Sequence, residues 1–144
     1  MIFLGSDHGG LELKNEILNY LQQKGVEATD CGTYNEESVD YPDIATTVCD
    51  KVLKENADFG ILFCGTGIGI SIAANKVKGI RAALLCGSFS AQMAKEHNNA
   101  NVICFGGRTT TSEQCIEMLE AFMNAQFQGG RHQCRVDKIM SVEK

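Results

Sequence analysis

The chain has 144 residues, 44% of them hydrophobic and 22% charged, a composition typical of one compact domain with a substantial core. Its net charge of −5 argues against a nucleic-acid partner, since duplex binding usually requires an extended basic surface. No apolar run reaches transmembrane length, and the first seven residues are too short and too quickly acidic for a signal peptide. We therefore expect a cytoplasmic protein of a single domain, without a membrane partner.

The first half of the chain alternates short apolar runs with helical patterns. Residues 2–6 predict a strand, and a turn over 7–10 precedes a helix that continues to about Lys24, where Gly25 ends it. Residues 26–31 predict a weaker second strand. A polar loop over 32–41 follows, and Pro42 opens the next helix, which has an apolar stripe.

The second half repeats this alternation. Residues 59–63 predict a third strand, which leads through a glycine-rich turn into a helix to about Lys76. Residues 81–85 predict a fourth strand before a helix capped by Ser88, and residues 102–105 predict a fifth strand. The positions Cys115, Leu119, Phe122, Met123 and Gln126 or Phe127 predict a long last helix that ends at about Phe127, and the tail over 129–144 lacks clear periodicity.

Strands that alternate with helices predict an α/β fold, here a three-layer αβα sandwich around a Rossmann-like five-stranded parallel sheet. Ligands of such sheets bind beyond the carboxyl ends of the strands. Asp7 and His8 follow the first strand, the turn over 64–69 follows the third, and Arg108 follows the fifth. We expect all of them on one rim of the sheet, which is the candidate site.

Residues 64–69, Cys-Gly-Thr-Gly-Ile-Gly, are typical of a turn that binds an anion. Their glycines allow positive φ and leave backbone N–H groups uncovered where the next helix begins. Cys64 lies beside these amides, in a setting that favours thiolate over thiol. A turn that only packs tightly would show the same glycines. Ile70 replaces the third glycine of the dinucleotide fingerprint, and residues 5–12 lack the lysine of a Walker loop, so we expect no NAD and no other cofactor.

The seven cysteines contain no CxxC pair with the spacing of a zinc or redox site, and their odd number argues against a disulfide framework. We predict no metal site. Six of the cysteines are expected to be small buried residues that stay reduced, and only Cys64 has a reactive setting.

Six motifs occur together along the chain: Asp7-His8-Gly9-Gly10, Asp40-Tyr41-Pro42-Asp43, the turn over 64–69 with Ser71–Lys76, Gly79–Ala83, His97–Asn101, and Arg131-His132 with Arg135–Lys138. In these motifs the whole chain resembles the type B ribose-5-phosphate isomerases, a group that includes galactose-6-phosphate isomerase subunits. Members of this group use either a glutamate at the position of Ile70 or a cysteine at the position of Cys64 as the carbon base. This chain is of the cysteine kind.

The resemblance implies an aldose–ketose isomerase of the pentose phosphate pathway that interconverts ribose 5-phosphate and ribulose 5-phosphate through an enediolate. Cys64 would move the proton between C2 and C1, and Thr66 would relay hydroxyl protons. His97 would open the furanose ring with help from Asp7 and Tyr41. The implied substrate-binding residues are Asn98 for the open chain, the backbone of Gly65, Gly67, Ile68 and Gly69 for the enediolate, and His8, Arg108, Arg131 and Arg135 for the phosphate.

Each of these residues also has a purely structural interpretation. Asp7 would fit a helix cap, Tyr41 a core aromatic, and His97 a partner of a helix dipole. Arg131 and Arg135 would fit a solvated basic face. Thr66 and Asn98 would fit ordinary turn residues, and His132 is expected to be structural.

Two alternative functions stay open at this point. The substrate would also fit a six-carbon sugar phosphate such as allose 6-phosphate or galactose 6-phosphate. A non-catalytic sugar-phosphate sensor could share the fold, although a sensor needs neither a carbon base nor a ring opener.

The tail over 128–144 is expected to reach a partner subunit. The long helix before it, of about 16 residues, would carry the chain about 24 Å away from the tip of the fifth strand. Gly129 and Gly130 would then form a joint from which Arg131 and Arg135 reach a neighbour. We therefore expect a homodimer, with a dimer of dimers as the alternative.

Overall fold

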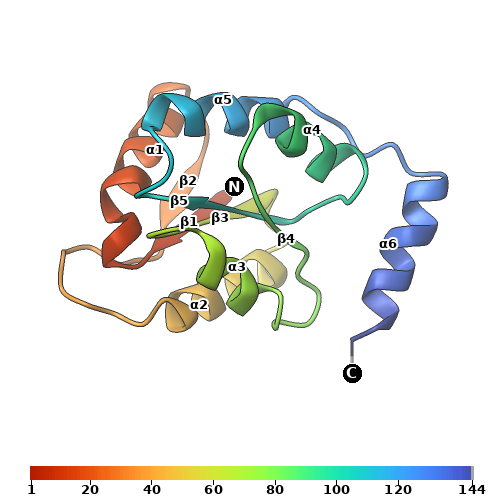
Figure 1. Ribbon diagram of the computed structural model, residues 1–144, viewed down its shortest axis with the longest axis horizontal. Helices are drawn as coiled ribbons and strands as arrows, with labels where there is room; N and C mark the ends of the chain where they lie inside the picture. Colours follow the sequence, from red (N-terminus) through yellow and green to blue (C-terminus); the bar gives the residue numbers. More distant parts are fainter. Residues whose placement is uncertain (144) are drawn as a thin grey trace.

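Five short apolar segments pair into one parallel sheet with helices on both faces, in a computed structural model that describes residues 1–143 (Figure 1). The strands are β1 (Ile2–Ser6), β2 (Ala28–Asp30), β3 (Phe59–Cys64), β4 (Ala82–Leu84) and β5 (Val102–Gly106), and their order is β2-β1-β3-β5-β4. The helices are η1 (His8–Gly10), α1 (Leu11–Gln23), α2 (Tyr41–Lys54), α3 (Ile68–Ala74), α4 (Ser88–Glu96), α5 (Ser112–Met123) and α6 (Arg131–Ser141). The predicted α/β sandwich is confirmed.

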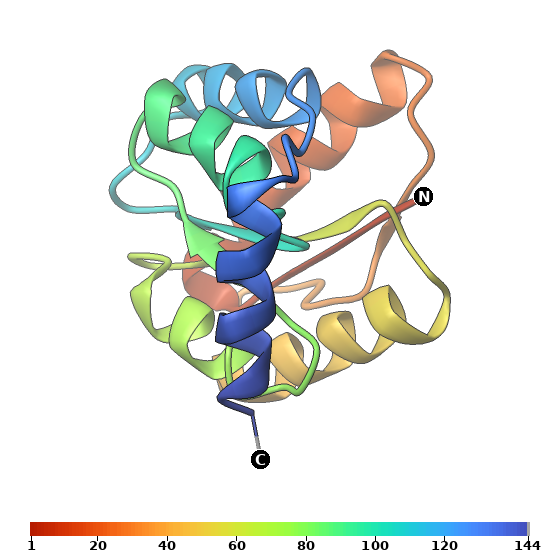
Figure 2. The same ribbon diagram turned by 90° about the vertical axis from the view of Figure 1, so that its right-hand side faces the viewer.

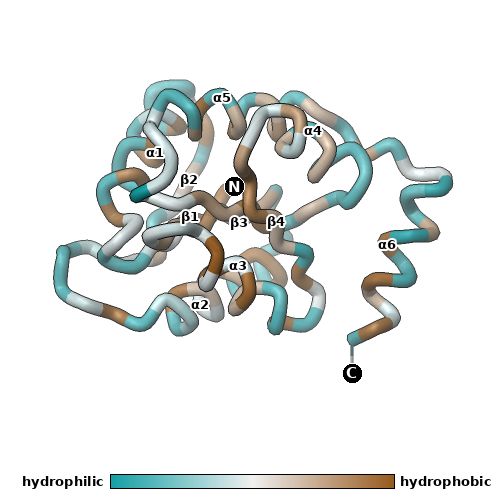
Figure 3. Tube along the Cα trace, viewed as in Figure 1, coloured by the Kyte–Doolittle hydropathy of each residue, from teal (hydrophilic) through white to brown (hydrophobic). Residues whose placement is uncertain are grey.

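The core has two halves, one on each face of the sheet. Successive strand side chains point to opposite faces, so Ile61 and Phe63 pack under α1, α4 and α5, whereas Leu62 and Cys64 pack against α2 and α3. Figure 3 shows the hydrophobic central strands between helices of mixed hydropathy. Because both faces are covered, the central strands are apolar along their whole length. The side chain of Cys64 therefore faces the α2 and α3 layer.

The element boundaries differ from the sequence predictions at two helix termini. Ser88 does not cap α4: it is the first helical residue after Gly87, and its hydroxyl donates to Glu117 Oε1 at 3.1 Å. Helix α5 ends at Met123, four residues earlier than expected, and it begins with a capping box between Thr111 and Gln114.

The tail that lacks clear periodicity in the sequence forms a helix, α6. Only His132 and Val136, four residues apart, are buried on it, and two positions are too few to give a periodic signal. Figures 1 and 2 show α6 at one end of the molecule, running from the α4 and α5 layer towards the α2 and α3 layer. Its carboxyl end is attached through Glu143, whose Oε1 accepts a hydrogen bond from the Gly79 N–H at 2.9 Å.

The cysteines are less uniformly buried than the sequence predicts. Cys49, Cys104 and Cys115 are buried, and burial raises the pKa of Cys49 to about 12 and raises the pKa values of the other two. Cys86 and Cys134, however, are exposed. Cys86 follows the edge strand β4, and Cys134 lies on the outward face of α6, so neither reaches the core.

Among helices of the described residues, none combines the length and the hydropathy of a bilayer-spanning segment.

Candidate active site

The carboxyl ends of β1, β3 and β5 meet at one rim of the sheet. Ser6 pairs in register with Phe63, and Cys64 with Gly106, so the segments that follow these strands start side by side. The N–H of Gly107 donates to the Cys64 carbonyl at 2.8 Å, and the N–H of Arg108 donates to the Gly65 carbonyl at 2.9 Å. These two bonds fix the loop after β5 against the glycine turn.

The sulfur of Cys64 lies at the centre of this rim. Its side chain is buried, and Sγ accepts a hydrogen bond from the Gly67 N–H at 3.1 Å. Gly67 precedes α3 with φ +79°, a conformation that favours glycine. Thr66 lies between them, where its hydroxyl accepts from the Ile68 N–H at 3.2 Å.

Tyr41 and Gly69 lie in contact on the α2 side of the rim. A Cβ atom placed on Gly69 would lie 2.5 Å from the Tyr41 ring and from its hydroxyl, so only glycine admits the ring at this position. Tyr41 is partly exposed and begins α2, so it is not the core aromatic of the structural interpretation. Its hydroxyl thus lies at the first turn of α3.

Asp7 is buried at the end of β1, and it does cap a helix. Its Oδ1 accepts a hydrogen bond from the Gly10 N–H at 3.1 Å, and η1 begins at the next residue. The carboxyl group also lines a cleft of about 660 Å³ formed with His8 and residues 38–43. Capping and a role in the site are therefore compatible.

His8 joins that cleft to a second hollow of about 500 Å³, which Gly107 and Arg108 also line. The Nδ1 atom of His8 accepts a hydrogen bond from the Val39 N–H at 3.3 Å. The neutral ring therefore carries its proton on Nε2, which can donate to a ligand oxygen. The Arg108 guanidinium covers Gly65, since Nη1 would lie 3.2 Å from a Cβ atom there.

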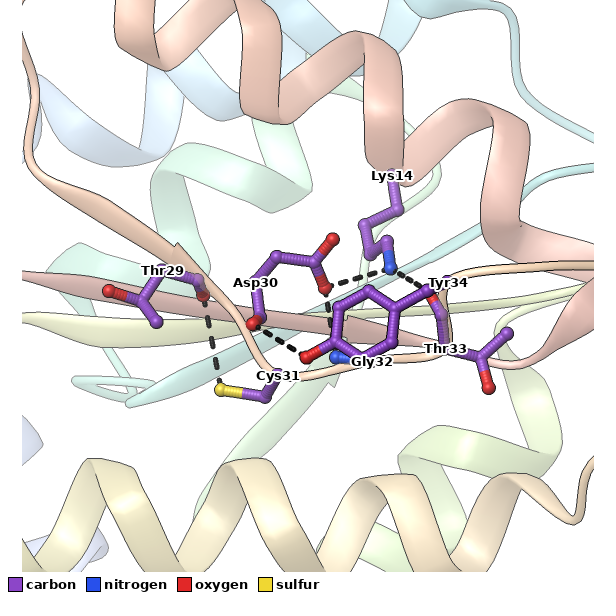
Figure 4. A network of polar contacts seen from close by, with 7 residues as sticks. All are labelled: Lys14, Thr29, Asp30, Cys31, Gly32, Thr33 and Tyr34. Atoms are coloured by element: carbon purple, nitrogen blue, oxygen red, sulfur yellow. Dashed lines mark hydrogen bonds and ion pairs between the residues drawn. The ribbon is translucent and has the colours of Figure 1, made fainter.

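The loop between β2 and α2, which forms one wall of the cleft, is anchored by a buried lysine (Figure 4). The Lys14 side chain is fully buried, and Nζ lies 2.8 Å from Asp30 Oδ1 and also donates to the Thr33 carbonyl. The same Asp30 oxygen accepts from the Gly32 N–H at 2.9 Å. Sequence reasoning missed Lys14, although it stands three residues before Ile17 on the apolar stripe of α1.

The other predicted site residues lie at the opposite end of the sheet. His97 caps the carboxyl end of α4, and the segment 97–101 leads into the first residue of β5. Asn101 there accepts a hydrogen bond from the Gly60 N–H at the beginning of β3. At about 3.3 Å per residue, β5 separates this segment from the glycine turn by about 13 Å. Within one chain, therefore, His97 and Asn98 do not meet Cys64.

Helix α6 lies at the same end and brings Arg131 and Arg135 with it. The ring of His132 stacks on the ring of His97, with centroids 4.1 Å apart and an interplanar angle of 7°. Arg81 donates from Nε to the Asn98 carbonyl at 3.3 Å and from Nη2 to the Asn99 carbonyl at 2.8 Å. His132 and Arg81 thus both contact the segment 97–101, a relation that sequence reasoning did not predict.

The candidate site is therefore divided between the two ends of the sheet. One end holds Asp7, His8, Tyr41, the turn of residues 64–69 and Arg108. The other end holds His97, Asn98, Arg131 and Arg135. Among residues 1–143, no three His, Cys, Asp or Glu side chains gather in a way that could hold a metal ion.

Comparison with known proteins decides the family. Residues 2–139 match the model of the family described as Ribose/Galactose Isomerase. The chain belongs to this family. Ribose-5-phosphate isomerase B of Escherichia coli is 46% identical over 143 residues, which cover 99% of this chain and 96% of that protein.

Solved structures of the family have the same fold. A ribose 5-phosphate isomerase from Thermotoga maritima superposes with a TM-score of 0.95 at 49% identity, covering 97% of each chain. Ribose-5-phosphate isomerase B from Mycoplasma genitalium, solved with bound ribulose-5-phosphate, gives a TM-score of 0.93 at 47% identity and covers 98% of this chain and 94% of its own.

Proposed function

We propose that this chain interconverts D-ribose 5-phosphate and D-ribulose 5-phosphate. The observation that carries the proposal is the Cys64 sulfur, which accepts the Gly67 N–H at the carboxyl end of β3 and lies on the same rim as Asp7, His8 and Arg108. Family membership supports it, as does the ribulose-5-phosphate bound to the relative from Mycoplasma genitalium.

The reaction moves one proton between adjacent carbons. The Cys64 thiolate takes the proton from C2 of the open-chain aldose, so that the C1 carbonyl becomes an enediolate oxygen. The resulting thiol returns a proton to C1 while the proton of the C2 hydroxyl passes to the oxygen on C1. The C2 oxygen becomes a carbonyl, the C1 oxygen becomes a hydroxyl, and the ketose forms with no net gain or loss of atoms. The backbone N–H groups of the turn over 65–69 stabilise the negative oxygen, and Thr66 relays the hydroxyl proton.

The phosphate requires positive charge in a chain of net charge −5. His8 and Arg108, which line one hollow at the rim, supply part of it through the His8 Nε2–H and the Arg108 guanidinium. Arg131 and Arg135 supply the rest of the positive charge. In their own chain they lie at the end of the sheet opposite to this rim. The site therefore requires these two arginines from a second copy.

We infer a homodimer in which each site combines the rim of one copy with the opposite end of the sheet of the second copy. β4 is an edge strand, and beside it lie exposed apolar side chains from α3, β4 and α4, namely Ile68, Ile72, Leu84 and Phe89. Such a patch on one flank supports an interaction surface. A two-fold axis beside β4 and perpendicular to the strands would reverse their direction, so that the amino end of the second copy lies next to this rim. His97 and Asn98 of the second copy would then open the ring and orient the chain.

Substrate comparison tests the activity. Turnover of ribose 5-phosphate, allose 6-phosphate and galactose 6-phosphate should be measured side by side, with Cys64→Ala as the background control. We expect the five-carbon sugar to have the highest kcat/KM. A higher kcat/KM for a six-carbon sugar phosphate would make that sugar the preferred substrate instead of ribose 5-phosphate. Absence of turnover for all three sugars, with tight binding, would indicate a sensor.

A further inference from the structure

We propose that His132 is a positioning residue: its ring holds the His97 imidazole in the orientation for ring opening and connects it to the helix that carries Arg131 and Arg135. The proposal rests on the proposed function and deepens it. Its basis is the near-parallel contact of the two rings, 4.1 Å apart at 7°, between the carboxyl end of α4 and the first turn of α6.

The stack is the contact that can fix the His97 ring. Its backbone is held by the helix, through the His97 N–H that donates to the Met93 carbonyl at 2.9 Å. Within residues 1–143, neither nitrogen of its ring forms a hydrogen bond in the chain. A partner that stacks on the face of an imidazole fixes the ring plane and leaves both edge nitrogens free. A hydrogen-bonding partner would instead occupy one of the nitrogens that a proton donor needs.

Other contacts keep α6 and the end of α4 together. Gln128, just before α6, donates from its backbone N–H to the Glu96 carbonyl at 3.0 Å and from Nε2 to Glu96 Oε1 at 2.6 Å. Arg131 and Arg135 are four residues apart on α6, so they share one face of the helix. Substrate phosphate held by these arginines would therefore also fix the position of His132, and through it the ring of His97.

The charges around the stack favour a neutral His132. Burial lowers the pKa of His132, and the nearby His97, Arg131 and Arg135 lower it further, because each disfavours another positive charge. Glu96 faces the same region, but its carboxylate is bonded to the Gln128 amide. A neutral His132 therefore adds no positive charge beside Arg131 and Arg135, and it acts on His97 through the ring stack.

The experiment compares three variants in two assays. His132→Ala removes the stack, His132→Phe keeps a planar ring without titration, and Val136→Ala truncates the other buried side chain of α6 while it leaves His132 in place. The first assay is turnover of ribose 5-phosphate, which must open its furanose ring. The second is deuterium exchange from solvent into C1 of ribulose 5-phosphate, which cannot form a furanose ring because its 5-hydroxyl is esterified.

We expect His132→Ala to lower kcat for ribose 5-phosphate by about 10- to 100-fold, the scale of a misplaced catalytic group, and to change deuterium exchange much less. His132→Phe should recover most of the loss, and Val136→Ala should stay close to wild type in both assays. The proposal would be overturned if His132→Ala kept the wild-type kcat or lost equally in both assays. It would also be overturned if His132→Phe had a kcat as low as that of His132→Ala, or if Val136→Ala had the same effects as His132→Ala. If wild type catalyses neither reaction, the proposed function fails first, and this result is recognised before any variant is compared.

Discussion

The Gly67 N–H lies 3.1 Å from the Cys64 sulfur and donates a hydrogen bond to it, so the glycine-rich turn and the candidate base are one structural unit. The three residues between the strand and α3 place the sulfur beside the positive end of the backbone dipoles. This relationship connects the glycine-rich sequence to the proton transfer.

Cys64→Ala should lower kcat by about 10²- to 10⁴-fold, the contribution of a general base, while the free energy of unfolding changes little. Cys64→Ser should be nearly as poor, because a hydroxyl is a much weaker base near neutral pH. Iodoacetamide should inactivate the enzyme in proportion to its reaction with Cys64, and bound substrate should slow both. The alkylation is best measured in a Cys86→Ser, Cys134→Ser background, since these two thiols are exposed. Activity near wild type in Cys64→Ala would remove the cysteine from the mechanism.

Gly69→Ala should displace Tyr41 from the rim. The added methyl would lie 2.5 Å from the tyrosine ring, which is partly exposed and can swing away. We expect about a tenfold loss of kcat/KM with little change in thermal stability. Gly87→Ala is the matched control, because its backbone is extended and no atom lies within 4 Å of the added methyl. Equal effects of the two substitutions on kcat/KM would show that the Tyr41 contact is not used.

The Lys14–Asp30 pair should contribute to stability through the loop that it anchors. Asp30→Asn leaves the fully buried ammonium of Lys14 with a weaker partner. We expect the free energy of unfolding, measured in urea, to fall by about 3 kcal/mol. Lys14→Met keeps the apolar stem and leaves a carboxylate that reaches solvent, so its cost should be smaller, about 1–2 kcal/mol. Glu55→Gln, which removes the exposed ion pair with Lys51, should change stability by less than about 0.5 kcal/mol. If Asp30→Asn lowered the free energy of unfolding no more than Glu55→Gln does, the result would contradict the anchoring role.

The titration of His132 predicts how stability depends on pH. Its pKa is lowered in the folded chain, so at a pH between the folded and the unfolded pKa the folded state binds fewer protons than the unfolded state. The contribution to stability is complete above the unfolded pKa of about 6.5 and is lost as the pH falls through the lower folded pKa. The free energy of unfolding of wild type should therefore decrease more between about pH 7.5 and pH 5 than that of His132→Phe. Parallel pH profiles for the two proteins would show that His132 is not destabilised as a cation.

The sequence predicted most of the sheet and the rim that holds one group of the candidate site residues. Apolar runs such as residues 59–63 gave the strand positions, because a strand covered on both faces has few other compositions. The rim that unites Asp7, Cys64 and Arg108 follows from the parallel order of the strands. Sequence reasoning did not predict that His97 lies at the opposite end of the sheet from this rim. The order of elements contained this information, since a segment that leads into a strand lies at the amino end of the sheet.

Other features depended on contacts that no local pattern reveals. Helix α6 has only two buried positions, so its apolar signal is weak although the helix is regular. The stack of His132 on His97 joins residues 35 positions apart and depends on the packing of α6 against the carboxyl end of α4. The hydroxyl of Ser88 bonds to Glu117 on the neighbouring helix instead of capping its own, a choice set by tertiary packing.

Mixing two inactive variants tests the composite site most directly. One variant carries Cys64→Ala and the other His97→Asn, and the two proteins are combined under conditions in which subunits exchange. If each site takes Cys64 from one copy and His97 from the other, every heterodimer keeps one intact site, and random exchange of equal amounts should restore about a quarter of wild-type activity. The control is a chain with both substitutions mixed with an equal amount of wild type, which should lose about half of the activity present before exchange. Activity no higher than the sum of the two parents after verified exchange, together with an unaffected wild type in the control, would contradict the shared site.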